Sequence, residues 1–329
     1  MKKVSGITLT IVTESPIALS NDQGFGNYTP IKKYFFKDGI HAMTSVATFT
    51  YELRKCLFEN FGWELSDITV KKSNLFYNDV ESTERKNLEA DVFGFLLPDQ
   101  QVSKTSPLRV IPFTSMSTYK NDTQLLTNRG FLNPDLARRR FTEAGEEIAV
   151  ENVPSTQALA NEEVFGDYYT YTLTIELDRI GVVEVKKVEG KKTEIQYKYL
   201  DPEDRIYMAP ELRVQAVQDI LNALTILTRD IKHQRVLLKP LAVFGGAFET
   251  AIPYFWNDAL LKEKQDKTII DTSNVQRTIE AYDLKDEAIV AVDNSMLDEA
   301  STIQTSPIQA LQDLANGLVI EENEWYLKE

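Results

Sequence analysis

The residues best suited to contact a nucleic acid gather in one segment near the N-terminus, between Gly26 and Lys55. Cations neutralise phosphates, flat rings stack on bases without reading sequence, and a helix N-terminus favours a phosphate. This mixture is typical of a single-strand binder, although an ordinary amphipathic hairpin followed by a capped helix would show the same spacing. The basic residues are Lys32, Lys33, Lys37, Arg54 and Lys55; the rings are Tyr28, Tyr34, Phe35 and Phe36; the hydroxyls at the predicted helix start are Thr44, Ser45 and Thr48.

A second basic group lies between Ser115 and Arg140, where few apolar residues recur periodically. A long ordered loop of this kind is more often functional than idle, which makes the group a second candidate for phosphate contact. A solvated run of charges is the alternative interpretation. Its members are Lys120, Arg129, Arg138, Arg139 and Arg140.

The rest of the chain offers no recognisable catalytic or metal-binding motif. A single cysteine, Cys56, excludes an internal disulfide and a cysteine-based metal cluster, and the two histidines are expected to be structural. The pair Gly245-Gly246 lacks the spacing of a phosphate-binding loop and is expected to form a turn. We therefore expect no cofactor, no metal ion and no enzymatic activity. The aspartates without metal-ligand spacing are Asp91, Asp122, Asp135 and Asp167.

The net charge of −14 at first argues against a nucleic-acid partner. Its distribution weakens that objection, because residues 280–329 carry a net charge of −10 and the preceding residues only −4. A nearly neutral body can still present a basic stripe. No run approaches the roughly 18 to 20 apolar residues of a membrane-spanning helix, so we expect a cytoplasmic protein with no membrane contact.

The periodicity of apolar residues predicts an α+β fold. Strand-like alternation and helix-like spacing follow one another in the order β, α, β, hairpin, α, β once a large insertion over 64–166 is set aside. That order is typical of an RRM-like (ferredoxin-like) domain, whose open sheet face binds RNA. The predicted elements are strands 4–14, 168–180 and 236–244, hairpins around 31–37 and 182–200, and helices from 44 or 45 to 61 and from 212 to 232, the latter opening after Pro210.

Five blocks in a fixed order resemble the DevR-like branch of the Cascade backbone family, which belongs to the RAMP superfamily, and the variant is most similar to type I-B. Each block is weakly specific alone, and their order carries the resemblance. They are VSGITLTIVTESPIALSND, FGNYTPIKKYFFKDGIHAMTSVATFTYELRK, ADVFGFLL, SPLRVIPFTSMSTYKND and FGDYYTYTLTIELDRIGV.

The resemblance implies a hand-shaped subunit with large finger and thumb insertions. Its RRM-like palm would comprise residues 3–61 and 165–248, its fingers 63–104 and its thumb 115–166. Residues 249–329 would complete the palm and end in an acidic tail, for which we expect a part in contacts between protomers.

The family's function would then be that of a non-catalytic crRNA-binding backbone subunit of a type I CRISPR interference complex. It would polymerise along the guide in a helical filament, join other Cascade subunits, and present the guide's bases to target DNA. Two alternatives remain: a metal-dependent RNA-cleaving type III-like subunit using Asp122 or Asp135, and a DNA-binding autoregulator. The expected RNA-binding residues are Lys32, Lys33, Lys37, Thr44, Ser45, Thr48 and Arg54, with Lys120 and Arg129 in the thumb.

Overall fold

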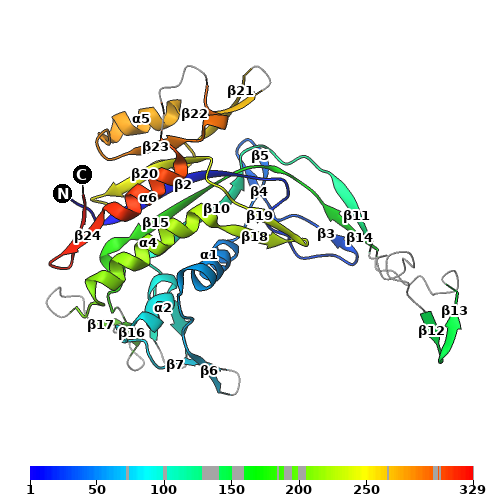
Figure 1. Ribbon diagram of the computed structural model, residues 1–329, viewed down its shortest axis with the longest axis horizontal. Coiled ribbons are helices and arrows are strands. Elements are labelled where there is room, and N and C mark those ends of the chain that lie inside the picture. The colour runs from blue at the N-terminus through cyan, green and yellow to red at the C-terminus, as the bar shows by residue number, and fades with distance from the viewer. Residues whose placement is uncertain are drawn as a thin grey trace.

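A five-stranded antiparallel sheet forms the centre of the protein (Figure 1). Its order is β10 (Leu108–Ser115), β15 (Asp167–Glu176), β2 (Gly6–Ser15), β20 (Ala242–Phe248) and β23 (Ile289–Val292). The predicted α+β class is confirmed. The computed structural model describes residues 1–71, 74–98, 102–127, 141–149, 159–183, 185–188, 195–198, 205–264, 267–298, 303 and 305–328.

The central strand β2 is buried on both faces. Ile7, Leu9 and Ile11 point into the main core, as the alternation predicts. On the other face the hydroxyls of Thr8 and Thr10 pair with those of Thr174 and Thr172, each at 2.9 Å. Because nearly every β2 residue is buried, the centre of the sheet offers no open platform on which bases could stack.

Four of the described helices contribute to the main core: α1 (Val46–Phe61), the short α2 (Leu88–Phe93), α4 (Pro210–Ile226) and α6 (Pro307–Gly317). The predicted first helix is confirmed, with Ser45 as its N-cap and Gly62 in the left-handed conformation at its end. The second begins at Pro210 as predicted but ends at Ile226 rather than near residue 232.

The chain after α4 differs from the prediction. A hairpin of β18 (Thr228–Ile231) and β19 (Gln234–Leu237) occupies the expected helix end, and its turn holds Lys232 and His233 with φ of 51° and 60°. The single strand predicted over 236–244 is also wrong, because β20 begins only after Pro240. Gly245 and Gly246 lie inside β20 rather than in a turn.

The insertion after α1 pairs with a distant hairpin. It contains β6 (Ile68–Lys71), β7 (Asn74–Tyr77), η1 (Arg85–Asn87), α2 (Leu88–Phe93), β8 (Phe95–Leu97) and β9 (Val102–Lys104). Strand β9 pairs with β16 (Val185–Val188), which pairs with β17 (Ile195–Lys198) as the predicted second hairpin. The result is a four-stranded sheet below the main one in Figure 1.

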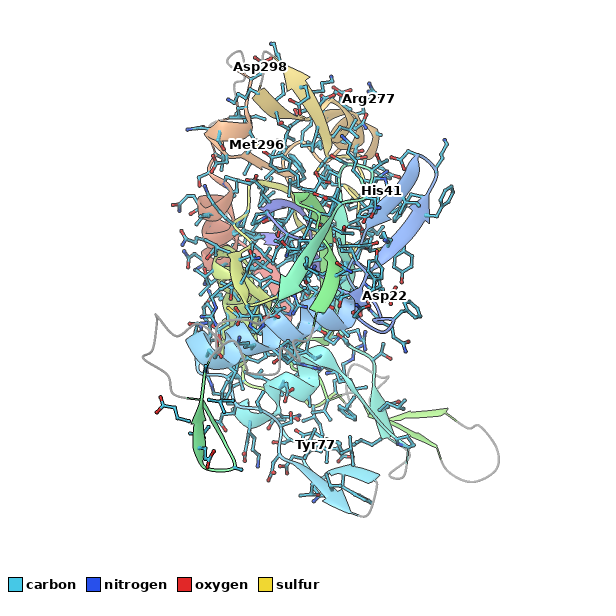
Figure 2. The ribbon with its side chains drawn as sticks, turned by 90° about the vertical axis from the view of Figure 1, so that its right-hand side faces the viewer. Asp22, His41, Tyr77, Arg277, Met296 and Asp298 are labelled. Atoms are coloured by element: carbon cyan, nitrogen blue, oxygen red, sulfur yellow. The ribbon has the colours of Figure 1, made fainter. Side chains whose placement is uncertain are left out.

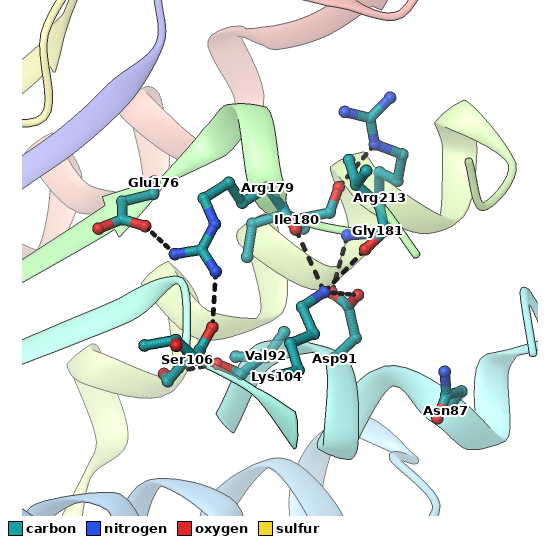
Figure 3. Close-up of polar contacts among 12 residues, drawn as sticks. Asn87, Asp91, Val92, Lys104, Ser106, Glu176, Arg179, Ile180, Gly181 and Arg213 are labelled. Atoms are coloured by element: carbon teal, nitrogen blue, oxygen red, sulfur yellow. Dashed lines mark hydrogen bonds and ion pairs between the residues drawn. The ribbon is translucent and has the colours of Figure 1, made fainter. Parts of the chain in front are cut away.

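A buried polar network joins this insertion to the central sheet (Figure 3). Asp91 on α2 binds the Lys104 ammonium and accepts a hydrogen bond from the Gly181 amide at 2.7 Å. Lys104 also donates to the Val182 carbonyl at 2.9 Å. The first turn of α4 reaches the same loop, where Arg213 Nε donates to the Ile180 carbonyl at 2.8 Å.

Two strands leave the sheet together and project to the right in Figure 1. We call β11 (Thr123–Thr127) and β14 (Leu159–Glu163) the arm; β3 (Tyr28–Thr29) pairs in parallel with β14. A further hairpin of β12 (Phe141–Glu143) and β13 (Glu146–Ile148) is drawn beyond it. Close to the start of the arm lies the hairpin of β4 (Lys33–Phe36) and β5 (Gly39–Ala42), which the sequence predicted.

The elements after residue 259 pack against the sheet and against α4. Hairpin β21 (Leu260–Lys264) and β22 (Lys267–Asp271) and helix α5 (Ser273–Tyr282) pack with β20 and its neighbours in a second core. A turn η6 (Asn294–Met296) follows β23, as η4 (Leu177–Arg179) follows β15. After α6, β24 (Leu318–Glu321) and β25 (Glu324–Leu327) form a hairpin that pairs with β1 (Lys2–Lys3). None of the described helices is both long and apolar enough to cross a bilayer.

Candidate nucleic-acid interface

The predicted binding segment converges at the end of β10. The β5 strand connects directly to α1, and the backbone between them binds β10 through a hydrogen bond from Thr44 N to Phe113 O at 2.9 Å. The loop that follows β10 folds back onto β5, where Tyr119 N donates to Ile40 O at 2.7 Å. The β4–β5 hairpin, the start of α1 and the Lys120 loop therefore meet in one place.

The β4–β5 hairpin exposes aromatic rings next to positive charge. Phe35 is 82% exposed and Tyr34 is 46% exposed, while Lys37 lies exposed at the turn. The Lys32 ammonium lies 5.8 Å from the centre of the Tyr34 ring. Exposed rings beside cations are suited to single-stranded nucleic acid, because rings stack on bases and cations neutralise phosphates.

His41 connects this hairpin to the end of β10. Figure 2 shows it at the hairpin, far from Tyr77 in the insertion. One ring nitrogen contacts the backbone carbonyl of Ser115 at 2.8 Å and the other contacts Asp38 at 3.2 Å. The Ser115 hydroxyl instead donates to Ser117 O. Ser115 and His41 are therefore not arranged as a nucleophile and its base.

The hydroxyls at the start of α1 are partly occupied by the helix itself. Ser45 Oγ accepts a hydrogen bond from the Thr48 amide at 3.1 Å and lies 3.0 Å from the Thr48 hydroxyl. The Thr44 hydroxyl is buried and has no hydrogen-bond partner. The helix N-terminus retains amides and a positive dipole end that could bind an anion.

Lys33 lies in a different environment from its neighbours. Its ammonium donates to both carboxylate oxygens of Glu163, at 2.7 and 2.6 Å, and lies 4.4 Å from the centre of the Tyr119 ring. Burial alone would raise the pKa of the Glu163 carboxyl, but hydrogen bonds from Lys33, Tyr28 and the Ile31 amide leave that pKa below its usual range.

Of the remaining predicted RNA-binding residues, Lys120 lies at the end of β10 and Arg54 does not. Arg54 lies on α1 roughly 12 Å along the axis from the helix start, and there it pairs with Glu89 at 3.5 Å and stacks on Phe93 at 4.5 Å. Lys120 is exposed beside the hairpin. Arg129 lies outside the described residues, as do Arg138, Arg139 and Arg140.

The aspartates considered for metal binding are scattered. Asp91 is neutralised by buried Lys104, and Asp167 accepts hydrogen bonds from the amide and hydroxyl of Ser117. Asp122 accepts one from the Thr123 amide at 2.8 Å. Within the described ranges no three acidic, histidine or cysteine side chains are grouped to hold a metal ion; Asp135 lies outside them.

Three residues at this site had no signal in the sequence. Glu162, Glu163 and Lys232 come together only through the tertiary fold, with Lys232 Nζ donating to Glu163 O at 2.6 Å. An acidic pair at the end of a strand has no local pattern that marks it as a lysine partner. The left-handed turn at Lys232 falls at the end of the helix that the sequence predicts over 212–232.

Comparisons with known proteins agree with this architecture. Two solved chains titled "CRISPR RNA-guided surveillance complex, pre-nicking" and "CRISPR RNA-guided surveillance complex" match with TM-scores of 0.60 and 0.54. Each is 12% identical and covers 94% of this chain, with 99% and 98% of its own length matched, so the likeness is one of fold. Among curated proteins no relative matches. The model of the family described as CRISPR-associated negative auto-regulator DevR/Csa2 matches residues 7–225, and the chain therefore belongs to that family.

Proposed function

We propose that this chain is a non-catalytic backbone subunit of a type I CRISPR interference complex, of the I-B variant. It binds crRNA, polymerises along the guide in a helical filament with other Cascade subunits, and presents the guide's bases to target DNA. The family membership and the matched fold of surveillance-complex chains support this proposal. Sequence choice would rest on base pairing, so the protein needs backbone contacts rather than base-specific ones.

The observation that carries the proposal is the convergence at the end of β10. Exposed Phe35 and Lys37, the start of α1 and exposed Lys120 gather there, although the first and last are 85 positions apart in the chain. No salt bridge of the described residues involves Lys37 or Lys120, which leaves both ammonium groups available to phosphates. Lys32, Ser45 and Thr48 complete the proposed contact surface, and Arg129 is proposed from the sequence alone. Thr44, expected from the sequence to bind RNA, is 1% exposed and is not part of this surface.

The palm is proposed to be RRM-like. The chain order β2, α1, β10, β15, α4, β20 and the sheet order β10-β15-β2-β20 support this assignment, because they match a β-α-β-β-α-β arrangement. Residues 3–61 and 165–248 would then need β10 to complete the sheet. Since both faces of β2 are covered, we place the guide at the end of β10 instead of across the sheet.

The insertions supply the other proposed parts. The β6–β9 region over 63–104 is assigned as fingers, and 115–166, which includes the arm, as thumb. Residues 249–329 extend the palm, since β23 forms its edge strand and α6 packs against α4.

Co-expression with a CRISPR array tests the proposal. The protein is purified with and without the other subunits, sized by chromatography with light scattering, and any bound RNA is sequenced. We expect repeat-spacer RNA in a large particle. A small RNA-free particle that stays unchanged when partner subunits are added would overturn the proposal.

Two further measurements on the same particle address the alternatives. Incubating the particle with complementary RNA and Mg²⁺ or Mn²⁺ measures cleavage, and an activity abolished by Asp122→Ala would favour the RNA-cleaving alternative. Binding to duplex DNA of the operon, in the absence of RNA, would favour the autoregulator.

A further inference from the structure

The Glu163 carboxylate is saturated with hydrogen-bond donors where the arm leaves the body. It accepts from the Tyr28 hydroxyl at 2.5 Å, from the Ile31 amide at 2.7 Å, and from Lys33 through both oxygens. These donors come from the segment that leads into β4, far from β14 in sequence. Glu163 is only 4% exposed, so this carboxylate is a fixed internal contact rather than a surface charge.

Lys232 holds the same end of the arm from another element. It reaches across from the β18–β19 turn, donating to the Glu163 carbonyl at 2.6 Å and lying 3.4 Å from a Glu162 carboxylate oxygen. Its side chain is 6% exposed. Lys232 has φ of 51°, a conformation that residues other than glycine rarely adopt without a local reason. The two-residue turn supplies that reason, because Lys232 and His233 both have positive φ, as the central residues of a type I′ hairpin turn do.

Lys33 is held by Glu163 and is not free to bind a phosphate as an unpaired lysine would be. A lysine ammonium has three N–H donors, and Lys33 directs two hydrogen bonds to Glu163 while its charge lies against the Tyr119 ring. Moving it to a phosphate would leave the buried Glu163 charge without its main counter-ion, which is costly. Lys33 therefore acts on the arm, through Glu163.

We propose that Glu162 and Glu163, held by Lys33 and Lys232, form a joint that fixes the direction of the arm. These four are positioning residues, and their value for guide binding rests on the proposed function, in which the arm belongs to the thumb. A fixed arm direction would make successive copies meet the guide at a regular spacing. A loose arm would bind RNA without that regularity.

Spin-label distances test the joint directly. In a Cys56→Ala background, labels at Leu125→Cys on the arm and Phe58→Cys on α1 occupy exposed positions. Pulsed electron–electron double resonance on the RNA-free protein should give one narrow distance distribution. The variants Lys33→Met, Glu163→Gln and Lys232→Gly should each lose the narrow peak.

Lys232→Gly changes both positioning and stability, so its thermal unfolding is measured beside the distances. Glycine relaxes the left-handed backbone at this turn, but loss of the amine leaves the nearly buried Glu162 carboxylate without Lys232. The matched control is Lys3→Met, which removes the exposed Lys3–Glu324 ion pair and should leave the distance distribution unchanged. A narrow peak that persists in all three joint variants would overturn the proposal.

A second readout distinguishes the joint from the proposed function. Nuclease protection of a long guide should show regular spacing with the original protein and lose that regularity with Lys232→Gly, while affinity for a short RNA stays the same. If the original protein protects no RNA, the proposed function fails, but the spin-label result still decides whether the joint exists. Regular protection by Lys232→Gly together with a broadened distance distribution would show that the joint does not set guide spacing.

Discussion

Lys104 places its ammonium against the carboxylate of Asp91 inside the protein, where both side chains are almost completely shielded from water. Each partner has further polar contacts, to the Val182 carbonyl for Lys104 and from the Gly181 amide for Asp91. The pair lies where the insertion meets the central sheet (Figure 3). Each charge is neutralised only while the other residue of the pair is present.

Removing one partner should be far more damaging than removing both. We expect Lys104→Met to lower the free energy of unfolding by about 3 to 5 kcal/mol, because it leaves a buried carboxylate unpaired. The double variant Asp91→Leu with Lys104→Met should recover much of that loss. Urea unfolding of the three proteins measures the difference, and a single variant within about 1 kcal/mol of the original protein would contradict the expectation.

Gly245 should tolerate no side chain. A Cβ there would lie 1.9 Å from the Thr8 carbonyl oxygen, between the two central strands, and φ is 152°. We expect Gly245→Ala to cost about 3 kcal/mol or more, by overpacking and backbone strain. Gly145→Ala is the matched control, since φ is also positive but nothing lies within 4 Å, and it should cost about 1 kcal/mol. Comparable losses for the two would argue against the packing explanation.

The sequence predicts helix ends well where a cap, a glycine or a proline determines them locally. Ser45 and Gly62 define the ends of α1 by capping and left-handed geometry. Pro210 starts α4 because its fixed φ suits a helix and it has no amide hydrogen to leave unpaired. The joint was not foreseeable, because Lys33 and Glu163 are 130 positions apart and no pattern in the sequence links them. The interpretation of Gly245 as a turn was wrong because only its neighbour across the sheet explains a glycine there.

The C-terminal segment is needed for the fold, which affects how its acidity can be tested. Trp325 is fully buried, and Leu311 and Leu314 pack into the main core. We expect Trp325→Ala to lower the free energy of unfolding by about 3 to 5 kcal/mol, and deletion of 305–329 to prevent folding. Chemical denaturation followed by circular dichroism measures both.

The proposed part of this segment in protomer contacts calls for milder changes. Asp313, Glu321 and Glu322 are exposed, so replacing them with their amides should leave thermal stability nearly unchanged. Assembly on RNA, measured by light scattering, should weaken if these charges face a neighbouring copy. Unaltered assembly of the triple variant would remove the acidic surface from the protomer interface.

Acid should loosen the arm through Glu163. The pKa of this carboxyl is lowered in the folded protein, so the unfolded chain binds the proton first as pH falls. The stabilisation is therefore present above the unfolded pKa and is lost as pH falls through the folded value. The groups that face this end of the arm are Lys33, Lys232, Tyr28 and Tyr119. The hydrogen bond to Glu163 raises the pKa of Tyr28, and burial, then the Glu163 charge, raises the pKa of Tyr119 to about 12, so both phenols stay protonated over this range.

Hydrogen exchange over residues 27–31 between about pH 7 and about pH 3 measures this effect. After correction for the intrinsic pH dependence of exchange, the original protein should lose protection towards the acid end. Glu163→Gln should show low protection at both ends, because its side chain does not titrate. Equal pH dependence in the two proteins would assign the loosening to other carboxylates.

Guide binding should depend on Lys37, Lys120 and Phe35 in different ways. Each lysine that contacts a phosphate should reduce the slope of log affinity against log salt by about 0.7 when changed to alanine, since fewer counterions are released. Phe35→Ala should cost about 1 to 3 kcal/mol with the salt slope unchanged, because stacking carries no charge. Fluorescence anisotropy with a labelled single-stranded RNA at several salt concentrations measures both quantities. Lys3→Ala, beside the chain termini, should alter neither, and a Lys37 variant with an unchanged slope would place the guide away from the end of β10.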